Sequence, residues 1–194
     1  MGSDQMKVLL FSGGIDSSAL AYWLRPDLLL TIDYGQQAAA GEISAAIALA
    51  AEFRIAHEVL DVDLSKLGRG LMADRPSSEL AHSPEWWPYR NQLLITLAGM
   101  RFVADGLQEI IIGAVNSDVH ADGKEPFLTF INRAMQAQEG HVKVNAPAHD
   151  ISPEELLEFS SFPRDLLGLT FSCHVSEYPC GTCPGCLKHS RLTL

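Results

Sequence analysis

Residues 7–18 read KVLLFSGGIDSS and place a short apolar run directly before a glycine turn and the start of a helix. The apolar run over 7–11 has the composition of a buried strand. The turn Ser12-Gly13-Gly14 interrupts it, and residues 16–24 have the pattern of a helix that ends before Pro26. A strand, a glycine turn and a helix in this order are typical of a domain in which helices pack on a sheet.

The rest of the chain repeats this alternation. Strands are predicted over 28–33, 58–62, 109–113 and 142–146, and helices over 41–53, 91–105, 127–138 and 153–159, with a short helix after Ser161. The sequence Ser152-Pro153-Glu154-Glu155 has the pattern of a capped helix start. We therefore expect an α/β fold of Rossmann-like type, in which a parallel five-stranded sheet carries helices on both faces. The carboxyl ends of such strands meet at one edge, where ligands bind.

Composition limits the classes of function. The 194 residues include 14 Lys and Arg against 24 Asp and Glu, which gives a formal charge of −10 and argues against broad binding to nucleic acid or to anionic lipid. No apolar run is long enough for a membrane span, and no leader pattern opens the chain, so a cytoplasmic location is expected. We expect a tail over 1–6, a nucleotide-binding domain over 7–168 and a cysteine-bearing segment over 169–194.

The turn after the first strand is a candidate anion site. Its two glycines let the backbone turn tightly and present its N–H groups, and the helix that follows adds the positive end of its dipole. Ser12, Ser17 and Ser18 add hydroxyl donors. The stretch lacks the Gly-Lys-Ser/Thr of a Walker A loop and the spacing of a dinucleotide fingerprint. The alternative is a simple helix cap after a glycine turn.

The cysteines gather near the end of the chain, at Cys173, Cys180, Cys183 and Cys186. Four thiolates within fourteen residues can surround one Zn²⁺ ion with no open position, which predicts a structural metal site. An iron–sulfur cluster suits the same ligands, and free buried cysteines are a further alternative. His174 and His189 flank the site and are expected to be solvated or to contact the ligands rather than bind the metal.

The string SGGIDS (12–17) resembles the signature of the PP-loop ATP pyrophosphatases. Together with the cysteines it resembles the 7-cyano-7-deazaguanine synthases of the queuosine pathway. The resemblance runs from about residue 7 to 187, and its further blocks are DYGQ (33–36), PYRN (88–91), IGAVN (112–116), TFSC (170–173) and PCGTCPGCL (179–187).

The resemblance implies an adenine nucleotide alpha hydrolase-like fold and a dimeric ATP-dependent C–N ligase. ATP and Mg²⁺ would adenylate the carboxylate of 7-carboxy-7-deazaguanine with release of pyrophosphate, and ammonia would give the amide and then the nitrile. It implies Asp16 and Arg90 as catalytic residues, with Asp16 near Mg²⁺. For ATP it implies Phe11, Ser12, Gly13, Gly14, Asp16, Ser17, Ser18, Tyr34, Gly35 and Gln36, and for the deazapurine Arg90, Asn91, Gly113, Asn116 and Asp118.

The acceptor end departs from the family pattern. Soon after the position of Asn116 the synthases carry an aromatic residue followed by Pro-Asp-Cys-Arg, whereas residues 117–127 here read SDVHADGKEPF. This difference points to an alternative, a relative used in antiphage defence that couples the adenylated acid to a protein amine and stops at the amide. Two further functions fit the sequence less well. A sulfur transferase acting on tRNA would need a cysteine near the ATP site, whereas all four cysteines here lie in one C-terminal cluster. A non-enzymatic adaptor would carry a degenerate loop, whereas the SGGIDS motif is intact.

Other residues carry open alternatives. The pair Trp86-Trp87 can stack on a planar heterocycle or pack in the core or at an interface. Arg90 can bind phosphate or carboxylate through two hydrogen bonds, or form an ordinary ion pair. His120 can act as an acid or base, or be an exposed histidine without a role.

Overall fold

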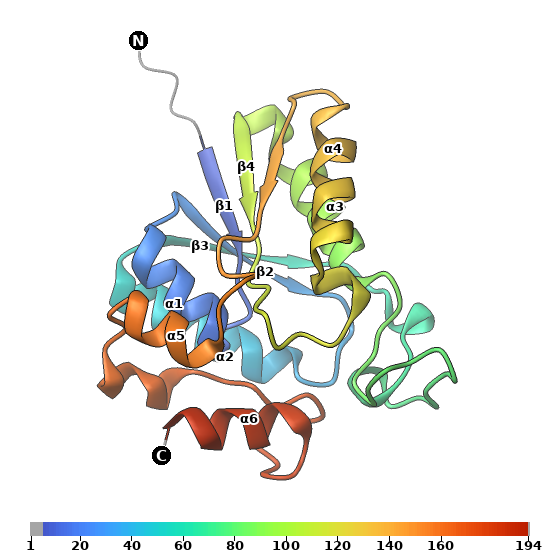
Figure 1. Cartoon of the computed structure of the whole chain (residues 1–194), viewed down its shortest axis with the longest axis vertical. Coiled ribbons are helices and arrows are strands. Elements are labelled where there is room, and N and C mark those ends of the chain that lie inside the picture. Colours follow the sequence, from blue (N-terminus) through green and yellow to red (C-terminus); the bar gives the residue numbers. More distant parts are fainter. Residues whose placement is uncertain (1–5, 194) are drawn as a thin grey trace.

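The computed structural model describes residues 6–193 and has a five-stranded sheet in the order β3-β2-β1-β4-β5. Every pairing between neighbouring strands is parallel. Figure 1 shows the strands fanning out between two groups of helices, with the C-terminal segment below them. The strands are β1 (Met6–Leu10), β2 (Leu28–Asp33), β3 (Ala56–Asp61), β4 (Leu107–Ile111) and β5 (Lys143–Asn145).

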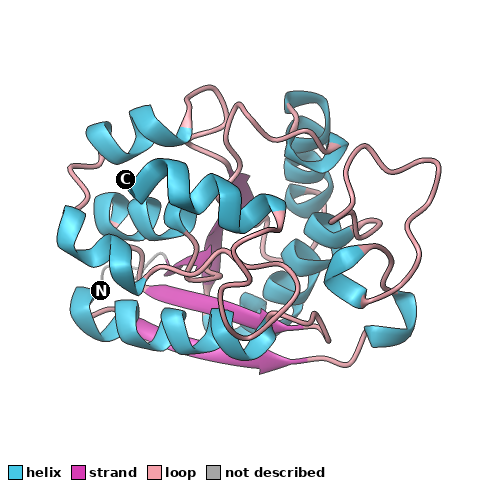
Figure 2. Ribbon diagram, turned by 90° about the horizontal axis from the view of Figure 1, so that it is seen from below, coloured by secondary structure: helices cyan, strands magenta, loops and turns pink. Residues whose placement is uncertain are grey.

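Helices cover both faces of this sheet, as Figure 2 shows from the side of the last helix. The α-helices are α1 (Ile15–Leu24), α2 (Ala39–Phe53), α3 (Arg90–Phe102), α4 (Glu125–Gln136), α5 (Pro153–Phe159) and α6 (Pro184–Thr193). Short 3₁₀ turns are η1 (Ser65–Leu67), η2 (Leu71–Ala73), η3 (Val103–Asp105), η4 (Ala121–Gly123) and η5 (Arg164–Leu169).

The core forms two layers, because successive side chains of a strand point to opposite faces of the sheet. Leu9 of β1 belongs to the layer beneath α1, α2 and α5, whereas its neighbour Val8 belongs to the layer beneath α3 and α4. Both side chains are fully buried. Strands buried on both faces need continuous apolar runs, which is why residues 28–32 are nearly all apolar.

The predicted elements and the parallel five-stranded sheet are confirmed, with shifts at their ends. Strand β4 begins two residues earlier than predicted, because Gly106 takes a left-handed conformation at φ 88° and ends the preceding turn. Helix α4 likewise begins at Glu125, with Pro126 inside its first turn. Helix α6 was not predicted, because its first residues, Pro184 to Cys186, belong to the cysteine motif. The predicted tail over 1–6 lies outside the described residues except for Met6, which begins β1.

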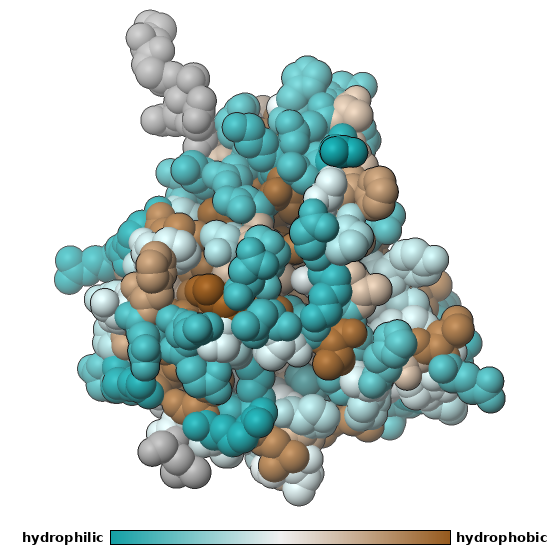
Figure 3. Space-filling view, viewed as in Figure 1, coloured by the Kyte–Doolittle hydropathy of each residue, from teal (hydrophilic) through white to brown (hydrophobic). Residues whose placement is uncertain are grey.

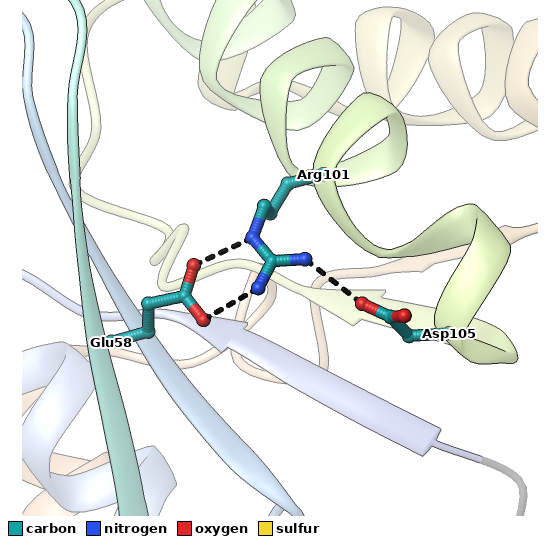
Figure 4. A network of polar contacts seen from close by, with 3 residues as sticks. All are labelled: Glu58, Arg101 and Asp105. Carbon is teal, nitrogen blue, oxygen red and sulfur yellow. Dashed lines mark hydrogen bonds and ion pairs between the residues drawn. The ribbon is translucent and has the colours of Figure 1, made fainter.

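Polar contacts tie the outer elements together. Arg101 of α3 donates to both carboxylate oxygens of Glu58 on β3, at 2.7 and 3.0 Å, and to Asp105 one turn further on, at 2.8 Å (Figure 4). These side chains are partly exposed, so they contribute little to stability. Hydrophilic side chains cover most of the face shown in Figure 3, with apolar ones scattered among them. Within residues 6–193, no helix combines the length and the apolar character that crossing a membrane requires.

The capped start of α5 is confirmed and gives a test of local stability. The Ser152 hydroxyl accepts from the Glu155 amide at 3.2 Å, and the Glu155 carboxylate accepts from the Ser152 amide at 2.7 Å. We expect Ser152→Ala to lower the free energy of unfolding by about 1 kcal/mol, as for other N-caps. Urea unfolding measures this difference. The exposed Ser190→Ala is the control, and equal stabilities of the two variants would contradict the assignment.

Candidate active site and four-cysteine centre

One cavity of about 580 Å³ opens at the carboxyl edge of the sheet. Its walls come from the segments that follow β1, β2 and β4, from the loop before α3, and from the C-terminal segment. The strand order changes direction between β1 and β4, and this is the place where open parallel sheets bind their ligands. A second hollow, between Trp23 and Phe159, lies away from these strand ends.

The glycine turn forms the floor of the cavity. Gly14 is the N-cap of α1, and the first helical hydrogen bond runs from the Ser18 amide to the Gly14 carbonyl at 3.0 Å. The preceding amides of the first turn therefore have no partner within the helix. Ser12 and Ser17 lie beside these amides in the cavity wall. The arrangement offers hydrogen-bond donors and a helix dipole to an anion such as a phosphate.

Gly13 fixes the turn in place. Its φ of 72° is left-handed, and a Cβ atom there would lie 2.9 Å from Ala45 Cβ and 2.9 Å from the Ala46 amide nitrogen of α2. A larger residue would therefore push the turn away from α2. Gly13 also accepts a hydrogen bond from the Phe171 amide at 2.9 Å, which joins the turn to the C-terminal segment.

An ion pair crosses the cavity at the start of α1. Lys188 Nζ of α6 lies 2.7 Å from Asp16 Oδ2, and both side chains are mostly buried. The other carboxylate oxygen, Asp16 Oδ1, is buried and has no partner within residues 6–193. A buried carboxylate oxygen without a partner fits a divalent cation or one of its water ligands.

A buried polar group lies after β2. Gln36 accepts from the Tyr34 amide at 2.8 Å and donates to Glu42 at 2.8 Å, so it holds the segment in place from behind the cavity. Burial raises the pKa of the Tyr34 phenol and the pKa of the Glu42 carboxyl. Arg90, at the start of α3, faces both of them and donates to Met72 Sδ at 3.1 Å. It is the cation at the centre of this wall.

The loop after β4 forms the opposite wall. Asp118 Oδ2 accepts from the Val115 amide at 3.1 Å, and burial raises the pKa of the Asp118 carboxyl. Asn91 of α3 donates through its side chain to the Asp122 carbonyl at 3.2 Å. The side chain of Asn91 therefore anchors this loop to α3 as well as lining the cavity.

Most residues predicted for the site come together in the cavity wall. Those that line it are Phe11, Ser12, Gly14, Asp16, Ser17, Tyr34, Arg90, Asn91, Gly113 and Asp118. Five lie outside the wall. Gly13 and Gln36 support the turns from behind, Ser18 is fully buried in α1, and Gly35 and the exposed Asn116 lie beyond the rim.

The structure adds residues that the sequence reasoning missed. Lys188 and Arg191 reach the cavity from α6, and Glu85 reaches it from the long loop before α3. No motif identified them, because their positions depend on how distant loops fold back on the sheet. Of the two alternatives for Trp87, the structure favours core packing: the ring is buried and meets Tyr34 edge to face at 4.9 Å between centroids.

The four cysteines form a compact group. Their Sγ atoms all lie within 4.8 Å of one another, with 3.9 Å between Cys180 and Cys186 and 4.0 Å between Cys173 and Cys183. A disulfide needs about 2.05 Å, whereas a tetrahedral zinc ion with bonds of about 2.3 Å holds its sulfurs about 3.8 Å apart. The group therefore fits a metal ion.

Backbone amides point at these sulfurs. The Cys183 amide donates to Cys180 Sγ at 3.3 Å, and the Cys186 amide donates to Cys183 Sγ at 3.4 Å. Hydrogen bonds of this kind, first of all from the Thr182 amide, lower the pKa of the Cys180 thiol to about 6. Burial raises the pKa of the Cys186 thiol to about 12. A bound metal ion would displace the proton of the Cys186 thiol, because only the thiolate is a metal ligand.

The cysteine segment is built against the glycine turn. A Cβ atom on Gly185 would lie 1.8 Å from the Ser172 carbonyl oxygen, so only glycine allows α6 to pass there. His189 of α6 exchanges a hydrogen bond of 2.8 Å with Thr170. The clustered side chains that could share an ion are the four cysteines, and His189 is not one of them among the described residues. These contacts place Lys188 over the cavity.

Comparison with known proteins identifies the family. The family model of Queuosine biosynthesis protein QueC matches residues 6–192. The chain belongs to the QueC family. The 7-cyano-7-deazaguanine synthase of Desulforudis audaxviator is 30% identical over 95% of this chain and 94% of its own length. Synthase 1 of Desulfitobacterium hafniense is 26% identical, over 98% and 92%.

A solved structure supports the fold alone. The NMN synthetase of Francisella tularensis superposes with a TM-score of 0.51 and 15% identity, over 87% of this chain and 66% of that one. The expected family and the expected α/β fold are thus both confirmed. QueC enzymes are ATP-dependent ligases. The matched region of this chain includes both the glycine turn and the four cysteines.

The cysteine group gives a second prediction. We expect Cys183→Ser to lose about one equivalent of metal per chain and to lower the unfolding temperature, because binding of a structural metal contributes to folding. Elemental analysis by mass spectrometry and thermal unfolding measure the two effects. Ser190→Ala on the exposed side of α6 is the control. A full metal content in Cys183→Ser would show that these sulfurs do not hold the ion.

Proposed function

We propose that this QueC-family chain adenylates the carboxylate of 7-carboxy-7-deazaguanine with ATP and converts the acyl adenylate to an amide and then to the nitrile. The observation that carries the proposal is the intact SGGIDS turn, whose free amides open into the cavity at the carboxyl edge of the sheet. A carboxylate is a poor electrophile, and transfer of AMP to it supplies a leaving group.

The reaction follows from this activation. A carboxylate oxygen attacks the α-phosphorus of ATP, and pyrophosphate leaves with the bonding electrons. Ammonia attacks the acyl carbon, and AMP leaves to give the amide. In the second round the amide oxygen takes AMP from another ATP, and loss of AMP and of the nitrogen-bound protons gives the nitrile. The protein orients the reactants and balances their charge.

Each wall of the cavity has a role in this scheme. The first-turn amides of α1, with Ser12 and Ser17, bind the pyrophosphate that leaves, and Lys188 neutralises part of its charge. Tyr34 contributes to the ATP site from the end of β2. Arg90, with Asn91, Gly113 and Asp118, binds the deazapurine and its carboxylate.

Two metal ions complete the proposal. Mg²⁺ would be held by Asp16, whose buried Oδ1 has no partner among the described residues, and would screen the phosphate charges. Zn²⁺ is the ion we assign to the four cysteines. A single ion accounts for sulfur separations near 4 Å, whereas an iron–sulfur cluster places several irons between its thiolates.

A protein amine is the second candidate acceptor. The loop over 117–127, which differs from the family pattern, supports it because this loop forms the acceptor wall of the cavity. In that reaction the chain would stop at the amide. The expected dimer and cytoplasmic location stay predictions.

The central experiment supplies purified protein with the acid, ATP, Mg²⁺ and ammonia. We expect pyrophosphate and AMP to appear only when the acid is present, and mass spectrometry to find the amide and then the nitrile. Asp16→Asn is the inactive control. Absence of pyrophosphate would remove the adenylation proposal, and amide that accumulates without nitrile would favour the protein-amine reaction.

A separate test addresses Lys188. We expect Lys188→Met to raise the KM for ATP about tenfold, since a hydrogen bond to a charged group contributes about 1.5–3 kcal/mol. Initial rates of pyrophosphate release at varied ATP measure it. Lys143→Met, on the exposed side of β5, is the matched control. An unchanged KM would show that Lys188 serves only to pair with Asp16.

A further inference from the structure

A second group of ionisable side chains lines the cavity, separate from the phosphate-binding turn. His120, from the loop after β4, exchanges a hydrogen bond of 3.0 Å between its Nε2 and the Ser83 hydroxyl. The same Nε2 lies 3.8 Å from Glu85 Oε1. Glu85 and Ser83 belong to the long loop before α3, so the contact joins two loops that are distant in the sequence.

Some buried polar atoms in and beside this group have no hydrogen-bond partner among the described residues. His120 Nδ1, Glu85 Oε2 and His174 Nδ1 are buried, and none has a hydrogen-bond partner among the residues that the structure describes. All three residues line the cavity. Buried polar atoms normally have partners, so three unsatisfied atoms around one cavity indicate a polar ligand. A carboxylate oxygen accepts hydrogen bonds, and an imidazole nitrogen accepts them when it carries no proton, so a hydrogen-bond donor fits this group.

A metal ion does not fit this group. Among residues 6–193, the side chains close enough to share an ion are the four cysteines, and the histidines and Glu85 do not form such a cluster. An ammonium ion or a protonated primary amine does fit, because it carries several N–H donors and a positive charge that Glu85 can balance.

We propose that His120, oriented by Ser83 and Glu85, binds the incoming nitrogen nucleophile and takes a proton from it. The proposal rests on the proposed adenylation, because it concerns the step that consumes the acyl adenylate. The ligand class is ammonium or a protonated primary amine. His120 would be a catalytic residue on the acceptor wall, where the chain departs from its family.

The geometry supports this role. When Nε2–H donates to Ser83, Nδ1 of the neutral ring is left as the acceptor. The nearby imidazole of His120, 3.8 Å from Glu85 Oε1, lowers the pKa of Glu85 to about 2, so its carboxylate stays charged and can stabilise the imidazolium that forms. A base that is oriented by a third group is the arrangement by which enzymes activate a nucleophile.

The proton and electron balance is complete. One N–H bond of ammonium breaks, the proton moves to His120 Nδ1, and the electron pair stays on nitrogen. That pair forms the C–N bond to the acyl carbon, and the C–O bond to AMP breaks with its electrons on the phosphate. The new amide nitrogen loses a further proton to solvent, and His120 returns its own proton to solvent.

Several ionisable side chains share the cavity with His120. Glu85 approaches His120 from the long loop, and His174 is near it from the C-terminal segment. Asp118, of the same loop as His120, lines the same cavity. Arg90 and Lys188 are the cations of the same cavity. At neutral pH almost all ammonia is present as the ammonium ion, so an enzyme without a base depends on the small fraction of free ammonia.

The test compares amide formation in the wild-type protein and in His120→Gln. With ammonium chloride at neutral pH we expect the variant to be about 100-fold slower, in the range of general base catalysis, while acid-dependent exchange of pyrophosphate into ATP is unchanged. Its rate should rise with pH as free ammonia increases, more steeply than that of the wild type. His82→Gln, an exposed histidine of the long loop, is the matched control.

A second nucleophile separates chemistry from folding. Hydroxylamine is neutral at neutral pH and needs no base, so it should restore the rate of His120→Gln to near the wild-type rate. Glu85→Gln should lose part of the ammonium-dependent rate and respond in the same way. A peptide containing lysine, tested beside ammonium chloride, shows which source supplies the amine.

Two results would overturn the proposal. A wild-type rate for His120→Gln with ammonium would exclude a base at this position, and an equal loss with hydroxylamine would assign His120 a structural role. Failure of the adenylation is a different result, because the wild-type protein would then show no acid-dependent exchange of pyrophosphate into ATP. That result would overturn both the proposed function and the role of His120.

Discussion

The backbone of Gly13 is the point where the main parts of the molecule meet. Its α-carbon approaches α2 so closely that a Cβ atom would lie 2.9 Å from Ala45 Cβ, and its carbonyl accepts from the Phe171 amide. Strand β1 ends just before it, and α1 starts just after it. Because one residue sets the distance between these elements, the direction of the first-turn amides of α1 depends on it. The proposed phosphate site is therefore a consequence of packing as much as of its own hydrogen-bond donors.

The four-cysteine segment extends this constraint to the far end of the chain. The close approach of Gly185 to Ser172 and the contact between His189 and Thr170 set α6 against the turn. Lys188 then contacts Asp16, which lies 172 positions earlier in the sequence. Three of the four clustered cysteines, Cys180, Cys183 and Cys186, lie just before or within the first turn of α6, so an ion that holds the cluster together also holds Lys188 in the cavity. This connects the proposed structural metal site to the charge balance of the proposed nucleotide site.

The sequence predicts those features that depend on local patterns. Both ends of the buried strand β2 can be predicted, because its apolar run is bounded by Pro26 and Gly35. The cap at Ser152 can be predicted from the spacing of Ser152 and Glu155. Lys188, Glu85 and the buried position of Trp87 could not be found in this way. Their roles depend on contacts between segments far apart in the sequence, and no local pattern records which loop folds over which strand. Helix α6 was missed because the cysteines explained its first turn.

The two sides of the cavity differ in how they relate to the family. The phosphate side consists of a backbone turn and a helix start, and its geometry tolerates few alternatives because Gly13 has no space for a side chain. The acceptor side consists of side chains on two loops, and these can change without disturbing the sheet. A chain can therefore keep ATP chemistry while it changes the nucleophile that receives the activated acid. The hydrogen bond between His120 and Ser83 lies on this side of the cavity, where it joins the loop over 117–127 to the long loop before α3.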